Sequence, residues 1–213
     1  MIRFENAGIH FDGKPLLESF NLDIESGEKV LLVSPSGRGK TSILKALLGF
    51  VPLSSGRILY KDVPLEKHAL WEFRKILSYV PQNTDLGEGS LRELLTQIWG
   101  LKAAGAKPPP MEELERLMKH FRLPGDILAK DFEKLSGGEK QRITFIIAAA
   151  LNWPVVLLDE PVSSLDAESK KLVRDYISAR KDWTVLAVSH DREWQETGSF
   201  RVVDLEPYQC SPR

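Results

Sequence analysis

The sequence predicts an α/β fold with a mostly parallel sheet, and three observations support this prediction. Short apolar runs at residues 30–33, 155–158 and 184–188 have the composition of strands that are buried on both faces. Each run is followed along the chain by a stretch with helical periodicity. A glycine-rich turn joins the first run to its helix. Strands that alternate with helices form parallel sheets that are covered by helices.

Length and composition limit the possible architectures and partners. The chain has 213 residues, enough for one core with a small appended subdomain. Its formal net charge of -1 gives no reason to expect a nucleic-acid partner. The single cysteine, Cys210, excludes an intramolecular disulfide and a cysteine-based metal site. No signal peptide follows Met1, so we expect a cytoplasmic protein.

The N-terminal part predicts a small antiparallel β region. Residues 2–4, 8–11 and 20–24 have strand patterns, with a turn at Asp12 and Gly13, and residues 57–60 are expected to join them. The remaining elements before the middle of the chain are expected to be a helix at 41–50, a helix at 65–75 and a strand at 77–80.

The pattern changes in the middle of the chain. Amphipathic helices are predicted at residues 91–101 and 111–121, separated by a stretch that contains three consecutive prolines. We interpret 83–140 as an inserted helical subdomain, and 1–82 and 141–213 as the core with its antiparallel region, within one domain spanning 1–213. Alternation then returns, with helices expected at 140–151, 167–179 and 192–197 and strands at 155–158, 184–188 and 200–205.

The glycine-rich turn has the pattern of a phosphate-binding loop. It differs from G-x-x-x-x-G-K-[ST] only because Ser34 stands at the first glycine. A glycine-rich turn that enters a helix presents free N–H groups, which can wrap a polyphosphate. Lys40 would lie beside the β- and γ-phosphates, and the Thr41 hydroxyl would bind Mg²⁺. An ordinary surface turn beside a lysine is the alternative. The predicted loop comprises Ser34, Pro35, Ser36, Gly37, Arg38, Gly39, Lys40, Thr41 and Ser42.

An apolar strand ends in two carboxylates, Asp159 and Glu160. The C-terminal edge of a parallel sheet is where such folds bind ligands. This arrangement is similar to a Walker B element, in which Asp159 would hold the Mg²⁺ shell and Glu160 would polarise the attacking water. A solvated acidic strand end is the alternative interpretation.

A second candidate phosphate-binding corner lies at Leu135, Ser136, Gly137, Gly138 and Glu139, just before a long apolar helix. This string resembles the LSGGE or LSGGQ signature of the nucleotide-binding subunits of ABC (ATP-binding cassette) ATPases. The resemblance implies a P-loop NTPase (RecA-like) fold with ATP and Mg²⁺ as cofactors. In that family the signature of one subunit covers the γ-phosphate bound by the other, in a head-to-tail dimer around two ATP molecules. The expected partner is therefore a second copy of this chain.

Further strings match the family in the family's order. Gln82 stands where the Q-loop glutamine contacts Mg²⁺ and the attacking water. The string Ser163-Ser164-Leu165-Asp166 is similar to the D-loop, which contacts the other subunit. A plain helix N-cap, which Asp166 could also provide, is the alternative. His190 stands where the switch histidine reaches the γ-phosphate, whereas a lone histidine is usually structural. Phe11 occupies the place of the aromatic residue that stacks on adenine, and a core phenylalanine is the alternative.

Two residues depart from the family's pattern. Ser34 replaces a glycine, and serine resists a positive φ, so the loop is expected to be tightened or re-aimed. Arg38 fills a position that small residues often take, where its guanidinium would meet a phosphate or a partner surface. Neither change removes Lys40, Glu160 or His190, which the resemblance implies are the catalytic residues. We therefore expect active ATP hydrolysis.

Three classes of ABC protein compete for the function. The first is the energy subunit of a transporter, at the inner face of the cell membrane, which drives a separate permease docked near residues 83–101. The second is a soluble ABC ATPase that acts on ribosomes or DNA. Such proteins resemble tandem cassettes in one chain or carry long coiled-coil insertions, and this sequence has neither. The third is a regulatory module without turnover, which Glu160 and His190 oppose. The compact plan and residues 121–128 resemble short bacterial subunits linked to iron export.

Overall fold

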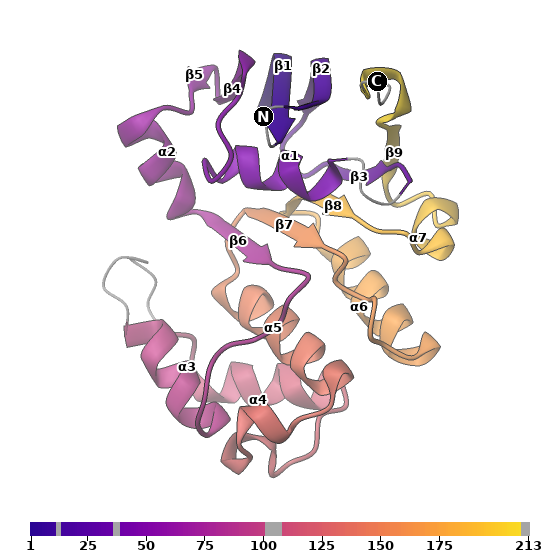
Figure 1. Ribbon diagram of the computed structural model, residues 1–213. Coiled ribbons are helices and arrows are strands. Elements are labelled where there is room, and N and C mark those ends of the chain that lie inside the picture. Colours follow the sequence, from indigo (N-terminus) through magenta and orange to yellow (C-terminus); the bar gives the residue numbers. More distant parts are fainter. Residues whose placement is uncertain (12–13, 36–38, 101–107, 210–213) are drawn as a thin grey trace.

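Five strands form a parallel sheet through the middle of the molecule (Figure 1). The computed structural model describes residues 1–11, 14–35, 39–100 and 108–209. Neighbouring strands of this sheet are parallel, in the order β6-β7-β8-β3-β9, which confirms the predicted α/β class. The strands are β3 (Lys29–Val33), β6 (Leu77–Val80), β7 (Val155–Asp159), β8 (Thr184–Val188) and β9 (Arg201–Asp204).

The central strands of the sheet are buried on both faces. Val30 joins the core cluster that contains α1 (Lys40–Leu47), whereas its neighbour Leu31 joins the cluster that contains α5 (Gly137–Leu151) and α6 (Ala167–Ala179). Successive side chains of a strand point to opposite faces, so each residue meets a layer of apolar side chains. This double burial explains why the strands are apolar runs with no polar alternation.

Helix α1 lies between the parallel sheet and the antiparallel sheet (Figure 1). Its buried side chains include Ile43, Leu44 and Leu47. The helix ends at Leu47, before the predicted residue 50, because Gly49 has a φ of +73° and its N–H bonds back to the carbonyl of Ala46. The sequence thus predicted the helix but placed its end too late.

The antiparallel sheet has the order β2-β1-β4-β5. Its strands are β1 (Ile2–Phe11), β2 (Lys14–Ile24), β4 (Ser55–Tyr60) and β5 (Val63–Pro64). The pairing of β4 with β1 confirms that the strand predicted at 57–60 joins this region. β1 is one strand with register shifts, where two short pieces were predicted, and the turn predicted at residues 12–13 lies outside the described part of the chain.

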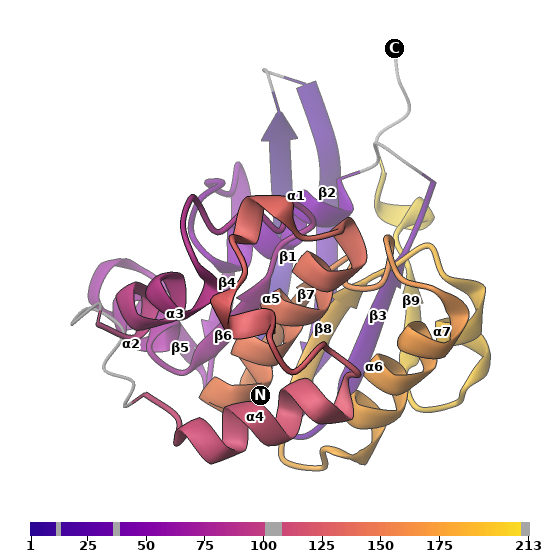
Figure 2. The same ribbon diagram turned by 90° about the horizontal axis from the view of Figure 1, so that it is seen from below.

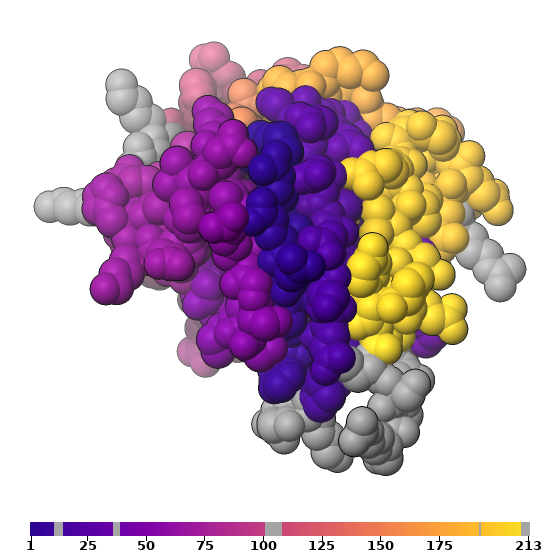
Figure 3. Space-filling model, turned by 90° about the horizontal axis from the view of Figure 1, so that it is seen from above, coloured from indigo at the N-terminus to yellow at the C-terminus, as the bar shows by residue number. Residues whose placement is uncertain are grey.

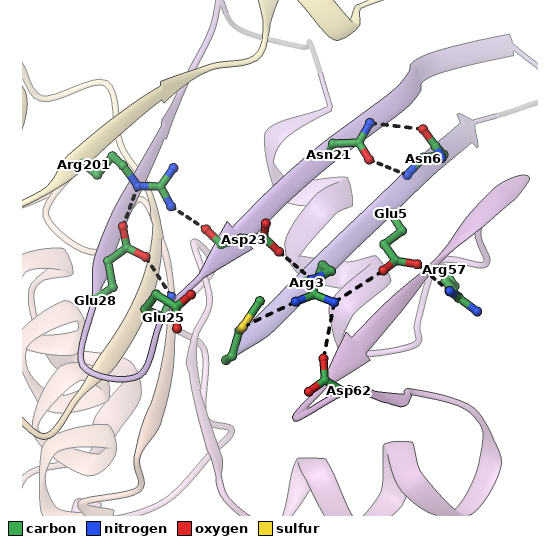
Figure 4. A network of polar contacts seen from close by, with 11 residues as sticks. Arg3, Glu5, Asn6, Asn21, Asp23, Glu25, Glu28, Arg57, Asp62 and Arg201 are labelled. Atoms are coloured by element: carbon green, nitrogen blue, oxygen red, sulfur yellow. Dashed lines mark hydrogen bonds and ion pairs between the residues drawn. The ribbon is translucent and has the colours of Figure 1, made fainter.

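Figure 3 shows the outer face of this sheet, with the strands side by side and the C-terminal segment beside β2. Exposed polar contacts link these strands to β9 (Figure 4). Arg3 of β1 donates to Asp23 of β2 at 2.8 Å, and Arg201 of β9 donates to the carbonyl of Asp23 at 2.5 Å. Exposed ion pairs of this kind contribute about 0–1 kcal/mol each, so the sheet is held mainly by its buried face.

The predicted helices of the middle segment are present. α3 (Leu91–Gly100) and α4 (Met111–His120) lie beyond α5, on the side of the parallel sheet away from α1 (Figures 1 and 2). The chain also forms α2 (Lys67–Arg74), α7 (Arg192–Glu196) and short 3-10 helices at Ile127–Ala129, Phe132–Lys134 and Glu206–Tyr208.

Helix α5 begins at Gly137, three residues before the predicted start at 140. The physical reason is a capping box, in which Ser136 accepts the N–H of Glu139 and the Glu139 carboxylate accepts the N–H of Ser136. The two glycines of the signature string therefore form the first turn of the helix. Over the residues described above, the structure contains no helix of the length and apolar character needed to cross a bilayer.

Candidate functional site

A cavity of about 620 Å³ opens where β3, β6, β7 and β8 reach their C-terminal ends. Parallel strands end at the same edge, so loops far apart in the sequence meet there. The lining combines the start of α1 with the loops after the other strands. Its residues are Leu16, Gly39, Lys40, Thr41, Ser42, Gln82, Glu160, Val162, Ser163, Lys170, Val188, Ser189, His190 and Asp191.

The structure brings together most of the residues that the sequence singled out. Asp159 lies at the end of β7, bonded to Thr41 of the cavity lining. Ser36, Gly37 and Arg38 lie outside the described residues, as does the side chain of Phe11, so those predictions stay open. The predicted residues that line the cavity are Gly39, Lys40, Thr41, Ser42, Gln82, Glu160 and His190.

The start of α1 is shaped by Gly39, which has a φ of +87°. That conformation suits glycine and turns the chain into the helix. The Lys40 side chain folds back, so that Nζ donates to the carbonyls of Ser34 at 2.7 Å and Pro35 at 3.0 Å. Burial lowers the pKa of Lys40, while the charges of Glu160 and Asp159 oppose this effect. Ser34 does not have a positive φ, so the strain expected from its replacing a glycine does not arise.

Asp159 is 1% exposed and accepts two hydrogen bonds. Its Oδ1 accepts from Thr41 Oγ1 at 2.9 Å, and its Oδ2 accepts from the Tyr79 hydroxyl at 3.2 Å. Burial, followed by the charge of Asp159, raises the pKa of Tyr79, so this hydroxyl remains a donor. The hydroxyl and carboxylate oxygens are hard ligands that fit Mg²⁺. No group of three or more His, Cys, Asp or Glu side chains suited to a metal lies within the described ranges.

The backbone of Glu160 is in the left-handed region, with a φ of +50°. A non-glycine residue held there costs about 1–3 kcal/mol, and such strain gathers at functional sites. Two contacts hold it: the Glu160 N–H donates to the carbonyl of Val188 at 2.9 Å, and Gln141 Nε2 donates to the Glu160 carbonyl at 2.9 Å. The strained turn thereby directs this side chain into the cavity that it lines.

The Glu160 carboxylate faces His190. Its Oε1 lies 3.5 Å from His190 Nε2 and has no hydrogen-bond partner among the described residues, while Oε2 accepts the His190 N–H at 3.3 Å. Burial raises the pKa of Glu160, and the hydrogen bond and charge of His190 partly oppose the rise. A buried oxygen with an unused acceptor position and a raised pKa is suited to binding a water molecule and taking its proton.

The signature string packs on the D-loop string of its own chain and does not line the cavity. A Cβ atom on Gly138 would lie 3.2 Å from the carbonyl oxygen of Ser164, so this close approach favours glycine. Asp166 is the N-cap of α6 and accepts the N–H of Ser169 at 2.8 Å, as the helix-cap alternative requires. Ser136 and Gly137 are exposed.

Sequence reasoning missed several residues of the site. Gln141, 1% exposed, also donates to Ser163 Oγ at 3.2 Å and accepts the Ser164 N–H at 2.8 Å, so it joins α5 to the loop after β7. Gln141 stands between Lys140 and Arg142 in the polar first turns of α5, so its sequence neighbours do not distinguish it from a solvent-exposed residue. The ion pair between Lys170 and Asp191 was not predictable from spacing, because its partners lie on separate elements.

Comparisons with known proteins agree with this geometry. The family described as ABC transporter matches residues 17–163. A protein of Escherichia coli (strain K12) named "Probable iron export ATP-binding protein FetA" is 30% identical over 98% of this chain and 92% of its own length. The protein named "Zinc import ATP-binding protein ZnuC" of Acinetobacter baylyi is 28% identical over 99% of this chain and 75% of its own length.

Among solved structures, a bacterial ABC transporter cassette crystallised as a dimer superposes with a TM-score of 0.83. It is 23% identical, and the match covers 96% of this chain and 94% of that one, so it establishes the fold. The fold and the family match together show that the chain is an ATPase of the ATP-binding cassette type, and it belongs to the ABC transporter family.

Proposed function

We propose that two copies of this chain close head-to-tail around two ATP molecules, with residues 136–139 of each copy covering the γ-phosphate held by Lys40 of the other. The main observation that supports the proposal is which residues line the cavity and which do not. Lys40, Glu160 and His190 line it, whereas the signature string lies elsewhere on the same chain with Ser136 exposed. The capping box uses the N–H groups of Ser136 and Glu139, and those of Gly137 and Gly138 at the start of α5 are suited to a phosphate that another copy presents.

Within each site we assign roles by chemistry. Glu160 polarises the attacking water, and His190 contacts the γ-phosphate. Mg²⁺ would be held by Thr41, Gln82 and Asp159, where it would neutralise charge on the phosphates. Phe11 is assigned to the adenine, and Asp166 to the contact with the second copy. The phosphates are wrapped by Ser34, Pro35, Ser36, Gly37, Arg38, Gly39, Lys40, Thr41 and Ser42.

A mixing experiment tests the shared site. One chain carries Lys40→Ala and the other carries Gly137→Asp. Gly137 is a good position for this change, because an added Cβ meets only Ser164 at 3.8 Å and an acidic residue in the first helical turn favours the helix. In a mixed dimer one composite site is doubly damaged and the other is intact. We expect each variant alone to be inactive and the mixture to regain ATPase activity.

Gly125→Asp is the matched control, since this glycine is also exposed and has no atom within 4 Å of an added Cβ. This variant should hydrolyse ATP at the parental rate. A mixture of Lys40→Ala and Gly137→Asp that stays inactive, while both chains remain folded and bind each other, would contradict the head-to-tail arrangement.

We further propose that the dimer drives a separate permease at the inner face of the cell membrane, and that the permease docks near residues 83–101 of the inserted helical subdomain, 83–140. A groove of about 480 Å³ lies along α3, with Leu95, Trp99 and Met111 in its lining. Met111 of this lining is 43% exposed, and an exposed apolar side chain in a groove is suited to an apolar group of a docked segment.

Met111→Ser tests this docking, because it removes an exposed apolar side chain from the lining of the groove. We expect weaker co-purification with membranes at unchanged ATPase activity of the isolated chain. Phe50→Ser, a change at an apolar side chain that is 66% exposed on another element, serves as the control. A chain that instead pellets with ribosomes would support the non-transport alternative and contradict the permease.

For the cargo we propose a metal, with iron export as the specific hypothesis. The supporting observation is the name of the Escherichia coli relative, which matches over nearly the whole of both chains. The zinc import name of a second relative shows that similarity alone does not fix direction. Cells that lack this chain should accumulate iron, and the parental gene but not Glu160→Gln should restore the normal content. Unchanged iron in the deletion strain would refute the hypothesis.

A further inference from the structure

Lys170 of α6 extends into the cavity that Lys40 and Glu160 line. Its Nζ lies 2.8 Å from Oδ2 of Asp191, and the two side chains are 30% and 12% exposed. A second lysine–carboxylate pair on the same helix, Lys171 with Asp175, is 65% and 53% exposed and does not line the cavity. The first pair is thus placed at the candidate site, and the second offers a comparison outside it.

Asp191 is held by three contacts. Its Oδ1 accepts the N–H of Glu193 at 3.0 Å, its own N–H donates to Ser189 Oγ at 3.1 Å, and its Oδ2 meets Lys170. These contacts fix the backbone on both sides of His190. A partly buried ion pair resists separation, because loss of one partner leaves the other charge poorly solvated. The contact with Lys170 therefore holds the Asp191 side chain in one position.

His190 itself has fewer restraints. Its backbone N–H donates to Glu160 Oε2 at 3.3 Å, its ring lies 3.5 Å from Oε1, and its side chain is 49% exposed. The direction of the imidazole is therefore set largely by the backbone that follows it, at Asp191. A small displacement of a reacting group lowers the rate steeply, so this anchor is relevant to hydrolysis.

We propose that Lys170 and Asp191 are a pair of positioning residues that hold His190 against Glu160 for ATP hydrolysis. The proposal rests on the role proposed above for His190. Lys170 stands in the first turn of α6, where its backbone N–H donates to the carbonyl of the N-cap Asp166 at 2.9 Å as in any helix. The ion pair therefore joins the loop that carries His190 to the first turn of α6.

The variants Lys170→Met and Asp191→Asn, alone and combined, test the pair. Each single change should lower kcat about tenfold and leave the KM for ATP within about twofold, because the pair orients a reacting group and does not bind substrate. The double variant should be no slower than the singles, since either change already breaks the contact. Lys170→Arg retains a cation that can reach the carboxylate and should recover most of the rate.

Lys171→Met and Asp175→Asn are the matched controls, because they make the same charge changes on the same helix away from the cavity. They should leave kcat within about twofold of the parent. Thermal unfolding of all variants is measured in parallel, so that a slow but fully folded variant is separated from a poorly folded one.

Three outcomes would overturn the pairing. Unchanged kcat in folded Lys170→Met and Asp191→Asn would show that the pair does not position a group that takes part in hydrolysis. A raised KM in Lys170→Met alone would show that Lys170 binds nucleotide directly. A further tenfold loss on adding Lys170→Met to His190→Ala would show that the lysine does not act through His190. A His190→Ala variant with parental kcat is a different failure, because it refutes the proposed role of His190 itself.

Discussion

Glu160 Oε1 lies 3.5 Å from His190 Nε2, although thirty residues separate the two along the chain. The adjacency follows from topology, because β7 and β8 are neighbouring parallel strands and each residue follows one of them. Asp159 and Val188 are the last paired residues of the two strands. Glu160 and His190, which follow one and two residues later, therefore lie at the same edge of the sheet. The chemistry of the site thus depends on strand order and on the length of each strand.

The first prediction concerns the carboxylate as a base. Glu160→Gln keeps the shape of the side chain and the bond that His190 N–H donates, but it removes the proton acceptor. We expect kcat to fall by about 10²–10⁴-fold, the usual contribution of a positioned general base. Phosphate release under saturating MgATP measures the effect, and nucleotide binding should persist. Hydrolysis at the parental rate would show that another group activates the water.

The second prediction concerns the stability of the same variant. Burial raises the pKa of Glu160 in the folded protein. The folded state therefore binds this proton more tightly than the unfolded state does. The resulting contribution to the free energy of unfolding is fully present below the unfolded-state pKa, and it is lost as pH rises through the folded-state pKa. At neutral pH the charged, partly buried carboxylate destabilises the folded state and an amide does not, so Glu160→Gln should have a larger free energy of unfolding than the parent.

Thermal unfolding at several pH values measures this difference. The melting temperature of Glu160→Gln should exceed that of the parent at pH 7, and the difference should disappear as pH falls toward the ordinary glutamate pKa of about 4.3. Glu18→Gln, a change at an exposed glutamate, is the control and should show no gap. A gap that is constant with pH would contradict a titrating origin.

The sequence predicted the layout of the molecule well, because patterns of apolar residues report burial directly. Runs such as 155–158 are apolar at every position since both faces of the sheet are covered. Helix ends were less predictable: α5 begins early because of the capping box at Ser136, and α1 ends early at Leu47. Both ends depend on local backbone geometry that periodicity does not contain.

The sequence predicted the motifs that line the cavity, but it did not predict the contacts that hold their residues in place. Lys40 and Glu160 stand in recognisable strings, whereas the positive φ of Glu160 and its bond from Gln141 arise from packing between distant elements. The link between Lys170 and Asp191 likewise joins α6 to the loop after β8. Such long-range contacts are set by tertiary structure, and one sequence contains no direct record of them.

The third prediction separates two partners of Asp159. Thr41→Val removes the hydroxyl that bonds to Oδ1 and that we assign to Mg²⁺, and Tyr79→Phe removes only the bond to Oδ2. The Mg²⁺ concentration needed for half-maximal hydrolysis should rise about 10–100-fold in Thr41→Val and by less in Tyr79→Phe. Titration of ATPase activity with Mg²⁺ measures both. Equal shifts would contradict direct binding by Thr41.

The fourth prediction concerns the missing glycine of the phosphate-binding loop. Because the backbone at Ser34 does not require a positive φ, Ser34→Gly gains no conformational relief. The added freedom of the unfolded chain should destabilise the protein by about 0.4–1 kcal/mol. The carbonyl that accepts Lys40 Nζ is retained, so the KM for ATP should stay within about twofold. A clearly tighter KM would show that the serine distorts the loop during nucleotide binding.

The fifth prediction concerns the support of the strained turn. Gln141 is nearly fully buried and bonds to the Glu160 carbonyl, to Ser163 and to Ser164. Gln141→Leu fills a similar volume but removes all three bonds. Ser163 and Ser164 are exposed and can bond to water, whereas the Glu160 carbonyl of the half-buried turn loses its donor at a cost of about 1–3 kcal/mol. The Glu160 backbone then loses the contact that offsets its positive φ, so kcat should fall beyond what the loss of stability explains.

Gln141→Glu refines this experiment, because a carboxylate can still accept the Ser164 N–H but cannot donate to the Glu160 carbonyl. Both variants are assayed well below their melting temperatures, so that the folded fraction is near one. We expect each to lose activity while the KM for ATP changes little, since the residues at the start of α1 that we assign to the phosphates are untouched. A folded Gln141→Leu with the parental kcat would mean that the other contact of Glu160, from its N–H to the carbonyl of Val188, is enough to hold the turn.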